Sequence, residues 1–190
     1  MALSVAFLAQ GWFFQTFENW AFEQRLRGEA VSLAALMVPG GEHSAPDPTA
    51  TTAKELPTAD ERSLVGRIEI PRIGLKAVIL EGVGQQTLAL AVGHIPGTAM
   101  PGRTGNVGIA GHRDTFFRGL SGVHTGDKIV VTTLNTLYEY SVKSFEVVGP
   151  KETRVLDDSS EPTLTLVTCY PFHYIGPAPK RFIVHAARVM

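Results

Sequence analysis

Short runs rich in β-forming hydrophobic residues, some of them alternating with polar residues, follow one another from residue 64 onward, separated by turn residues. In the first run, residues 67–70 (Arg-Ile-Glu-Ile) alternate with the period of two that is typical of a half-buried strand. Seven or so such strands within residues 64–190 predict an all-β barrel or sandwich. Short helices are expected at 84–93 and around 153–158. The other strands are predicted at 75–82, 106–111, 127–134, 138–149, 162–169 and 181–189.

The first 17 residues have a different pattern, because they are strongly apolar and carry no charged side chain. An α-helix of this length spans about 25 Å, close to the ~30 Å of a bilayer's hydrocarbon core. Aromatic residues gather at its end, where an interfacial belt would lie. We therefore predict a membrane-anchor helix over residues 1–24. A buried amphipathic helix and a cleaved signal sequence are the alternatives, and Arg25 and Arg27 leave the orientation undefined.

Residues 25–63 are predicted to connect this helix to the β-rich part. A helical pattern continues over residues 21–36, whereas 39–63 contain four prolines, few aliphatic residues and no aromatic residue. Such a composition is typical of an extended, solvated linker rich in Pro, Thr and Ala. The predicted organisation is an anchor (1–24), a helical extension with linker (25–63) and a β domain (64–190).

Composition and charge narrow the chemistry. The chain carries 17 Lys and Arg against 18 Asp and Glu, which removes the basic footprint of a nucleic-acid binder. Its single cysteine, Cys169, excludes an intrachain disulfide and a zinc site with two or more thiolates. One thiol and six histidines remain as candidates for chemistry.

The thiol lies in an informative position. Residues 163–169 (TLTLVTC) form a predicted strand whose Leu164 and Leu166 point into the barrel, which puts Cys169 on the opposite face. Pro171 ends the strand one residue after Tyr170. A lone cysteine is usually a small buried hydrophobe, but one at a strand end beside a loop is better placed to react.

Arg181 opens the next predicted strand. If the two strands pair as a hairpin, Cys169 and Arg181 lie close together at its open end. A guanidinium beside a thiol favours the nucleophilic thiolate and offers a charged donor to an oxyanion. An ordinary surface arginine is the alternative.

A cysteine nucleophile needs a proton acceptor and donor, for which histidine is best suited. His112 is favoured, because it follows a small-residue strand, 106–111, and precedes polar residues. His43 and His124 are expected to be solvated and His185 to be a packing residue. His94 and His173, in predicted loops, remain open.

Three segments resemble the sortase family of cysteine transpeptidases. They are GNVGIAGHRDTFF (105–117), TLTLVTC (163–169) and the Arg181 that follows, and they are most similar to class D. The resemblance implies a closed eight-stranded β-barrel with short helices, preceded by an N-terminal hydrophobic helix. It also implies a single-pass membrane enzyme whose catalytic domain lies outside the cytoplasm.

The resemblance further implies a mechanism. Cys169 would attack the Thr carbonyl of a Leu-Pro-x-Thr-Gly-like sorting signal, Arg181 would stabilise the oxyanion, and His112 would protonate the departing amine. The thioacyl-enzyme would then pass the exported protein to an amine, such as a cell-wall precursor or a pilin lysine.

Family similarity also makes the loop at 149–162 one wall of the peptide groove. Val155, Leu156 and Thr168 are the predicted substrate-binding residues, although Val155 and Leu156 could instead pin the loop to the barrel. No cofactor is predicted. Asp157, Asp158 and Glu161 are the carboxylates that a calcium site would use, a site we do not expect.

Two alternative functions remain. One is another cysteine hydrolase of cell-wall peptide, such as an L,D-transpeptidase, but the His-containing motif of that class does not precede Cys169. The other is a catalytically inactive, membrane-tethered β-barrel that binds a partner. Labelling of Cys169 by substrate would separate these alternatives from a sortase.

Overall fold

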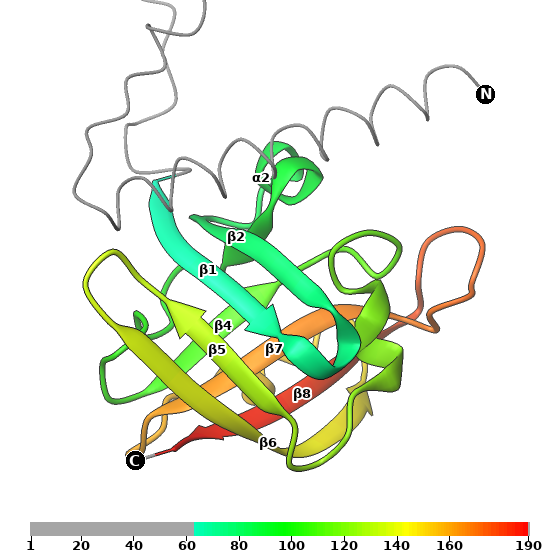
Figure 1. The fold of residues 1–190 in the computed structure, drawn as a ribbon. Coiled ribbons are helices and arrows are strands. Elements are labelled where there is room, and N and C mark those ends of the chain that lie inside the picture. The colour runs from blue at the N-terminus through cyan, green and yellow to red at the C-terminus, as the bar shows by residue number, and fades with distance from the viewer. Residues whose placement is uncertain (1–62, 190) are drawn as a thin grey trace, which may run out of the picture.

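Eight strands close into a barrel in the computed structural model, which describes residues 63–189 (Figure 1). The order around the barrel is β1-β2-β3-β4-β7-β8-β6-β5, with β2–β3 and β4–β7 parallel and the other pairs antiparallel. This confirms the predicted closed eight-stranded barrel. The strands are Leu64–Ile70 (β1), Leu75–Glu81 (β2), Val92–His94 (β3), Asn106–Ala110 (β4), Lys128–Thr132 (β5), Leu137–Val148 (β6), Thr163–Tyr170 (β7) and Lys180–Arg188 (β8).

The predicted anchor helix at 1–24 and nearly all of the predicted linker at 25–63 lie outside the described residues. Within residues 63–189, no helix combines the length and the hydropathy needed to cross a membrane. Membrane attachment therefore stays a prediction from the sequence.

Four short helical segments connect the strands: α2 (Gln85–Leu90), η2 (Pro71–Ile73), η3 (Arg118–Gly122) and η4 (Arg154–Leu156). The helix predicted around 153–158 is confirmed as η4. The helix predicted at 84–93 is confirmed as α2 but ends earlier, at Leu90, because the chain enters β3 at Val92. Gly93 explains the difference: a Cβ there would lie 2.2 Å from the Gly82 carbonyl oxygen, so this tightly packed strand requires glycine.

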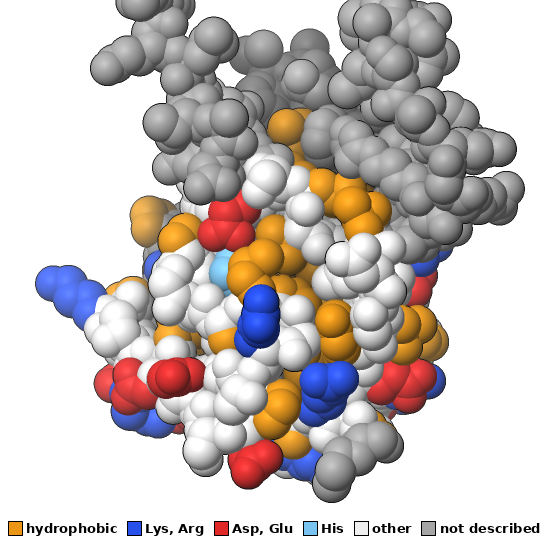
Figure 2. Space-filling view, turned by 90° about the vertical axis from the view of Figure 1, so that its left-hand side faces the viewer, with side chains coloured by type: hydrophobic (Ala, Val, Ile, Leu, Met, Phe, Trp, Pro, Cys, Tyr) orange, Lys and Arg blue, Asp and Glu red, His pale blue; other side chains and the backbone are white. Residues whose placement is uncertain are grey.

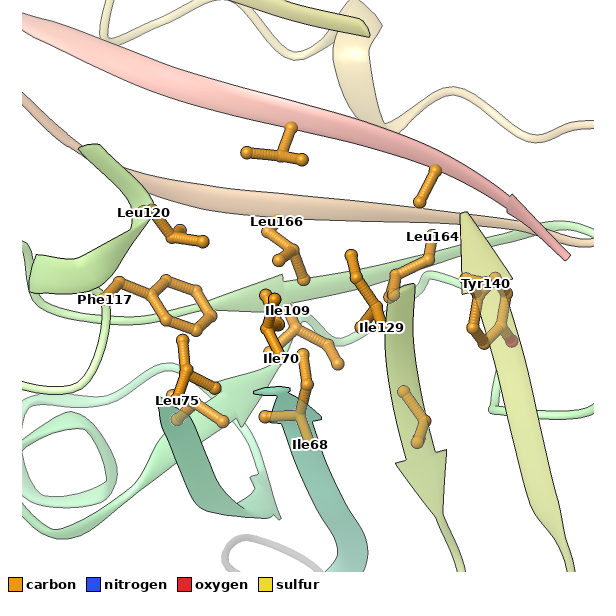
Figure 3. Close-up of a cluster of buried hydrophobic side chains, with 14 of the residues drawn as sticks. Ile68, Ile70, Leu75, Ile109, Phe117, Leu120, Ile129, Tyr140, Leu164 and Leu166 are labelled. Carbon is orange, nitrogen blue, oxygen red and sulfur yellow. The ribbon is translucent and has the colours of Figure 1, made fainter. Parts of the chain in front are cut away.

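The barrel interior is filled by aliphatic side chains from nearly every strand (Figure 3). Leu164 and Leu166 are fully buried, as the alternation of residues 163–169 predicts. Phe117 lies at one end of this cluster and Tyr140 at the other. Burial of each such side chain stabilises the fold by about 1.5–3 kcal/mol. The core therefore holds the barrel strands, and with them the strand ends, in fixed positions.

The outer surface carries no dominant charge on the face drawn in Figure 2. There, acidic and basic side chains of the described residues are intermixed with hydrophobic ones. This distribution agrees with the near balance of acidic and basic residues in the sequence.

Candidate active site

Cys169 lies one residue before the end of β7, directly opposite Arg181 in the antiparallel β7–β8 pair. Directly opposite residues have Cβ atoms about 4.5–5.5 Å apart, so the thiol and the base of the arginine side chain are neighbours. Both residues are half-buried, whereas Leu166 and Thr168 on the other face of β7 are buried. The structure therefore confirms the predicted placement of Cys169 and Arg181 at the open end of a hairpin.

His112 follows β4 by two residues and lies level with Cys169. The register of the parallel β4–β7 pair runs from Asn106 opposite Thr163 to Ala110 opposite Val167. Beyond it, the Gly111 N–H donates to the Val167 carbonyl at 3.1 Å. Counted two residues beyond the Ala110–Val167 pair, His112, which follows the end of β4, corresponds to Cys169, so His112, Cys169 and Arg181 lie at one end of the barrel.

Thr168 and Phe117 fix the backbone around His112. The Thr168 hydroxyl donates to the Gly111 carbonyl at 2.7 Å, and the Phe117 N–H donates to the His112 carbonyl at 3.0 Å. Gly111 is required because an added Cβ would lie 2.8 Å from the Phe117 ring. Thr168 is only 2% exposed. This supports a positioning role for Thr168, and its predicted contact with substrate stays a prediction.

The Arg181 guanidinium is held by its own loop. Its Nη1 donates to the Lys180 carbonyl at 2.9 Å and to the Ala178 carbonyl at 3.3 Å. Within residues 63–189, no carboxylate forms an ion pair with it. The charge is thus available to an anion that forms beside Cys169.

Arg113 is a residue that sequence reasoning missed. Its guanidinium donates to three carbonyls of the loop between β7 and β8: Pro171 at 3.0 Å, Tyr174 at 2.7 Å and Gly176 at 3.0 Å. It also lies 5.9 Å from the centroid of the Tyr174 ring, within cation–π range. Arg113 directly follows His112, and the loop that it holds connects Cys169 with Arg181. Its hydrogen bonds therefore link the backbone at His112 to the loop between the other two candidate residues. The only sequence signal was a cation beside His112 and a Pro- and Gly-rich loop whose carbonyls need donors.

Replacing Arg113 with lysine is expected to loosen the β7–β8 loop, because a single ammonium cannot match the planar fork that reaches three carbonyls. Amide hydrogen exchange in residues 171–179 should rise about tenfold or more, which corresponds to losing one or two charge-assisted hydrogen bonds. Exchange in β1 and β5 should not change. Unaltered exchange in the loop would show that Arg113 does not hold it.

The remaining histidines have other partners or lie elsewhere. His94, expected in a loop, is instead in β3 and only 2% exposed. Its Nδ1 lies 2.7 Å from Glu81 Oε2, and its Nε2 lies 3.0 Å from the Ala99 carbonyl oxygen. Both ring nitrogens are engaged, which removes His94 as a proton acceptor for the thiol. His124 and His173 are exposed.

His185 belongs to a polar network that crosses the outside of the barrel. Its Nε2 lies 3.1 Å from Glu146 Oε1 on β6, and its Nδ1 lies 3.4 Å from the Thr165 hydroxyl on β7. Hydrogen bonds from Arg154 and His185 hold the pKa of Glu146 below its usual 4.5. Thr165 shares a face of β7 with Cys169, yet it is buried under this network and donates to Asn106 Oδ1 at 2.8 Å.

Asn106 connects this polar network to η4 through hydrogen bonds. Its side-chain amide donates to the carbonyls of Val155 at 3.1 Å and Asp157 at 3.2 Å. Val155 is itself buried against Val148 and Ile183, so the structure favours the alternative that this residue pins the loop. Leu156 is only partly buried, and its Cδ2 lies 3.1 Å from where a Gly108 Cβ would be. Leu156 is thus the predicted wall residue that faces the outer side of β4.

The carboxylates considered for calcium do not form a cluster with further donors. Across residues 63–189, no group of three or more His, Cys, Asp or Glu side chains is arranged to hold a metal ion. Asp157 and Asp158 directly follow η4. The Asn106 side chain donates to the Asp157 carbonyl and so fixes the backbone there.

Fold and site together define a β-barrel cysteine enzyme. The family model described as a sortase domain matches residues 68–189, which is most of the barrel. The chain therefore belongs to the sortase family, whose members are cysteine transpeptidases.

Individual relatives agree with this assignment. The chain is 30% identical to Sortase D of Bacillus subtilis over 172 residues, covering 90% of this chain and 86% of that protein. Among solved structures, it is similar to a Clostridium perfringens Sortase D5 transpeptidase, with 36% identity and a TM-score of 0.61 over 67% of this chain and 79% of that one. Sortase A from Corynebacterium diphtheriae, a lid mutant, has 33% identity and a TM-score of 0.64 over 70% and 74% of the respective chains. The predicted likeness to class D is confirmed.

Proposed function

We propose that this sortase cleaves a Leu-Pro-x-Thr-Gly-like sorting signal through a thioacyl-enzyme and transfers the exported protein to an amine. The observation that carries the proposal is the register of the strand ends. Cys169 lies opposite Arg181 on β8 and level with His112, which follows β4. A nucleophile, a fixed cation and a proton carrier at one edge are the groups that acyl transfer requires.

In the proposed reaction, the Cys169 thiolate attacks the carbonyl carbon of the signal's Thr. Arg181 stabilises the negative oxygen of the tetrahedral intermediate, since its guanidinium carries hydrogen-bond donors and no carboxylate of the described residues neutralises it. His112 protonates the departing Gly amine, the C–N bond breaks, and a Thr–cysteine thioester remains. The acceptor amine then gives a proton to His112 and attacks the thioester, which releases the Cys169 thiolate and leaves His112 protonated as at the start.

The proposed partners follow from this reaction. The acyl donor is an exported protein with a C-terminal sorting signal, and the acceptor is an amine of a cell-wall precursor or a pilin lysine. The apolar run at 1–17 supports attachment to the membrane through an N-terminal helix, with the barrel at the cell surface. No cofactor takes part in these steps, and nucleic acid is not a proposed partner.

The test uses the full chain in detergent micelles, a Leu-Pro-x-Thr-Gly-like peptide and a small amine. Mass spectrometry should detect an enzyme adduct whose mass equals that of the peptide acyl fragment up to Thr, located on Cys169. Addition of the amine should discharge the adduct and yield the peptide–amine product with ping-pong kinetics. A folded enzyme that forms no adduct with a panel of sorting peptides would contradict the proposal.

A further inference from the structure

A hollow lies outside the barrel, beside the N-terminal end of β4, and apart from Leu156 the residues that line it have no part in the proposed chemistry. Its volume is about 390 Å³, which is within the range of ligand sites in proteins. One wall is the turn between β3 and β4, and the other consists of η4 and the residues after it. The residues that line it include Thr98, Ala99, Arg103, Asn106, Leu156 and Asp158.

Hydrogen bonds to β3 and β4 hold the turn wall. Thr98 accepts a hydrogen bond from the Gly108 N–H at 3.0 Å and donates to the Ile95 carbonyl at 2.7 Å. Ala99 donates its N–H to the Asn106 carbonyl at 3.0 Å, and its own carbonyl lies 3.0 Å from His94 Nε2. This wall is therefore fixed to β3 and β4 before any ligand arrives, which lowers the entropic cost of binding.

The η4 wall is fixed from below by Asn106, whose amide group uses both of its N–H donors on the backbone of η4. Thr165 in turn holds the Asn106 oxygen at 2.8 Å, and both residues are buried. Leu156 and Asp158 project from this wall into the hollow. Both walls of the hollow are thus preformed.

Strand register gives the distance from the hollow to the reacting thiol. Asn106 lies six residues before His112, and a strand rises about 3.3 Å per residue, which separates the hollow from Cys169 by about 20 Å. In an extended sorting signal, Leu precedes Thr by three residues, or about 10 Å. Leu156 packs over Gly108, about 13 Å from His112 by the same rise, and so matches the Leu-Pro part. Because Leu156 also lines the hollow, the hollow begins beside the Leu-Pro part and extends toward Asn106, one to three residues further upstream.

The charges at the hollow indicate which residue it prefers. Arg103 is exposed, and no carboxylate of residues 63–189 forms an ion pair with its guanidinium. The Asp158 carboxylate, by contrast, already accepts the Ser159 N–H at 2.9 Å. A guanidinium has five N–H donors and no acceptor, so an acidic side chain is its natural partner.

We propose that this hollow binds the substrate segment immediately N-terminal to the sorting motif and prefers an acidic residue there, facing Arg103. The inference rests on the proposed function, because the direction of the peptide follows from Thr at Cys169 and Leu at Leu156. It adds a second specificity determinant, outside the motif, that would distinguish exported proteins with the same sorting signal.

The test compares three peptides with the full chain in detergent: the bare motif, the motif preceded by six residues with Glu two to three positions before Leu, and the same extension with Lys there. The wild type should show a KM about two- to fivefold lower for the Glu peptide than for the Lys peptide, the size expected for one exposed ion pair. The preference should shrink as salt is added. The Arg103→Glu variant should invert it, whereas Lys143→Glu, the same charge change at an exposed position of β6, should leave it intact.

The outcomes separate the two proposals. If the bare motif is turned over and both extended peptides have the same KM as the bare motif, the hollow is not a subsite and the proposed function stands. A preference for Glu that survives in Arg103→Glu overturns the assignment of Arg103. If no peptide forms an adduct on Cys169, the proposed function fails and the inference fails with it.

Discussion

Replacing Cys169 with alanine is expected to abolish turnover, by about 10⁴-fold or more, as the removal of a catalytic nucleophile does in other acyl-transfer enzymes. The thioacyl adduct should disappear with it. Stability should change by less than about 1 kcal/mol, because the side chain is small and half-buried at a strand end, outside the main core. The measurements are adduct mass, steady-state turnover and thermal unfolding of the same preparation.

A second substitution, Cys169→Ser, tests whether turnover depends on the nucleophilicity of the thiol or only on the size of the side chain. Cys169→Ser keeps the size and a hydrogen-bonding group, but a hydroxyl is far less acidic than a thiol and ionises much less readily. We expect turnover nearly as low as in the alanine variant. An adduct that forms equally well in Cys169→Ala would place the nucleophile elsewhere, and substantial activity in both variants would refute covalent catalysis at this position.

The fold was predictable wherever a strand has five residues or more that either alternate or form a β-rich run between turn residues. β1, β7 and β8 alternate in part, β2, β4 and β5 are short apolar or small-residue runs, and turn residues separate the strands. β3 has only three residues, Val92, Gly93 and His94, all buried, so it presents no alternation. Closure of the barrel depends on the antiparallel β1–β5 pair and the parallel β4–β7 pair, which join segments 57 to 65 residues apart. That information came from the family resemblance and not from periodicity.

The site residues likewise fall into those that local sequence patterns predict and those whose position depends on pairing between distant segments. Cys169 and Arg181 could be brought together by simple hairpin logic, because a Pro-containing loop joins two alternating strands. The level position of His112 depends on β4 pairing in parallel with β7, about 57 residues away in sequence. Arg113 and the Asn106–Thr165 bond escaped prediction for the same reason. Their partners lie 58 to 63 and 59 residues away, and neither side chain belongs to a local motif.

Phe117 connects the stability of the barrel to the position of His112, and its removal is the largest stability change that we predict. The ring is fully buried at one end of the core and packs against Gly111, while the Phe117 N–H holds the His112 carbonyl at 3.0 Å (Figure 3). Phe117→Ala should lower the free energy of unfolding by about 3–5 kcal/mol, since it leaves a cavity. Chemical denaturation followed by fluorescence or circular dichroism measures this loss.

Activity distinguishes Phe117 from the rest of the core. Ile129→Ala in β5 removes a fully buried side chain at about 2–5 kcal/mol, but Ile129 does not support the segment around His112. Under conditions where both variants remain folded, we expect kcat to fall in Phe117→Ala by about tenfold or more, since small displacements of a catalytic group are costly. The kcat of Ile129→Ala should stay near the wild-type value. Equal kcat values in the two variants would mean that Phe117 stabilises the barrel without positioning His112.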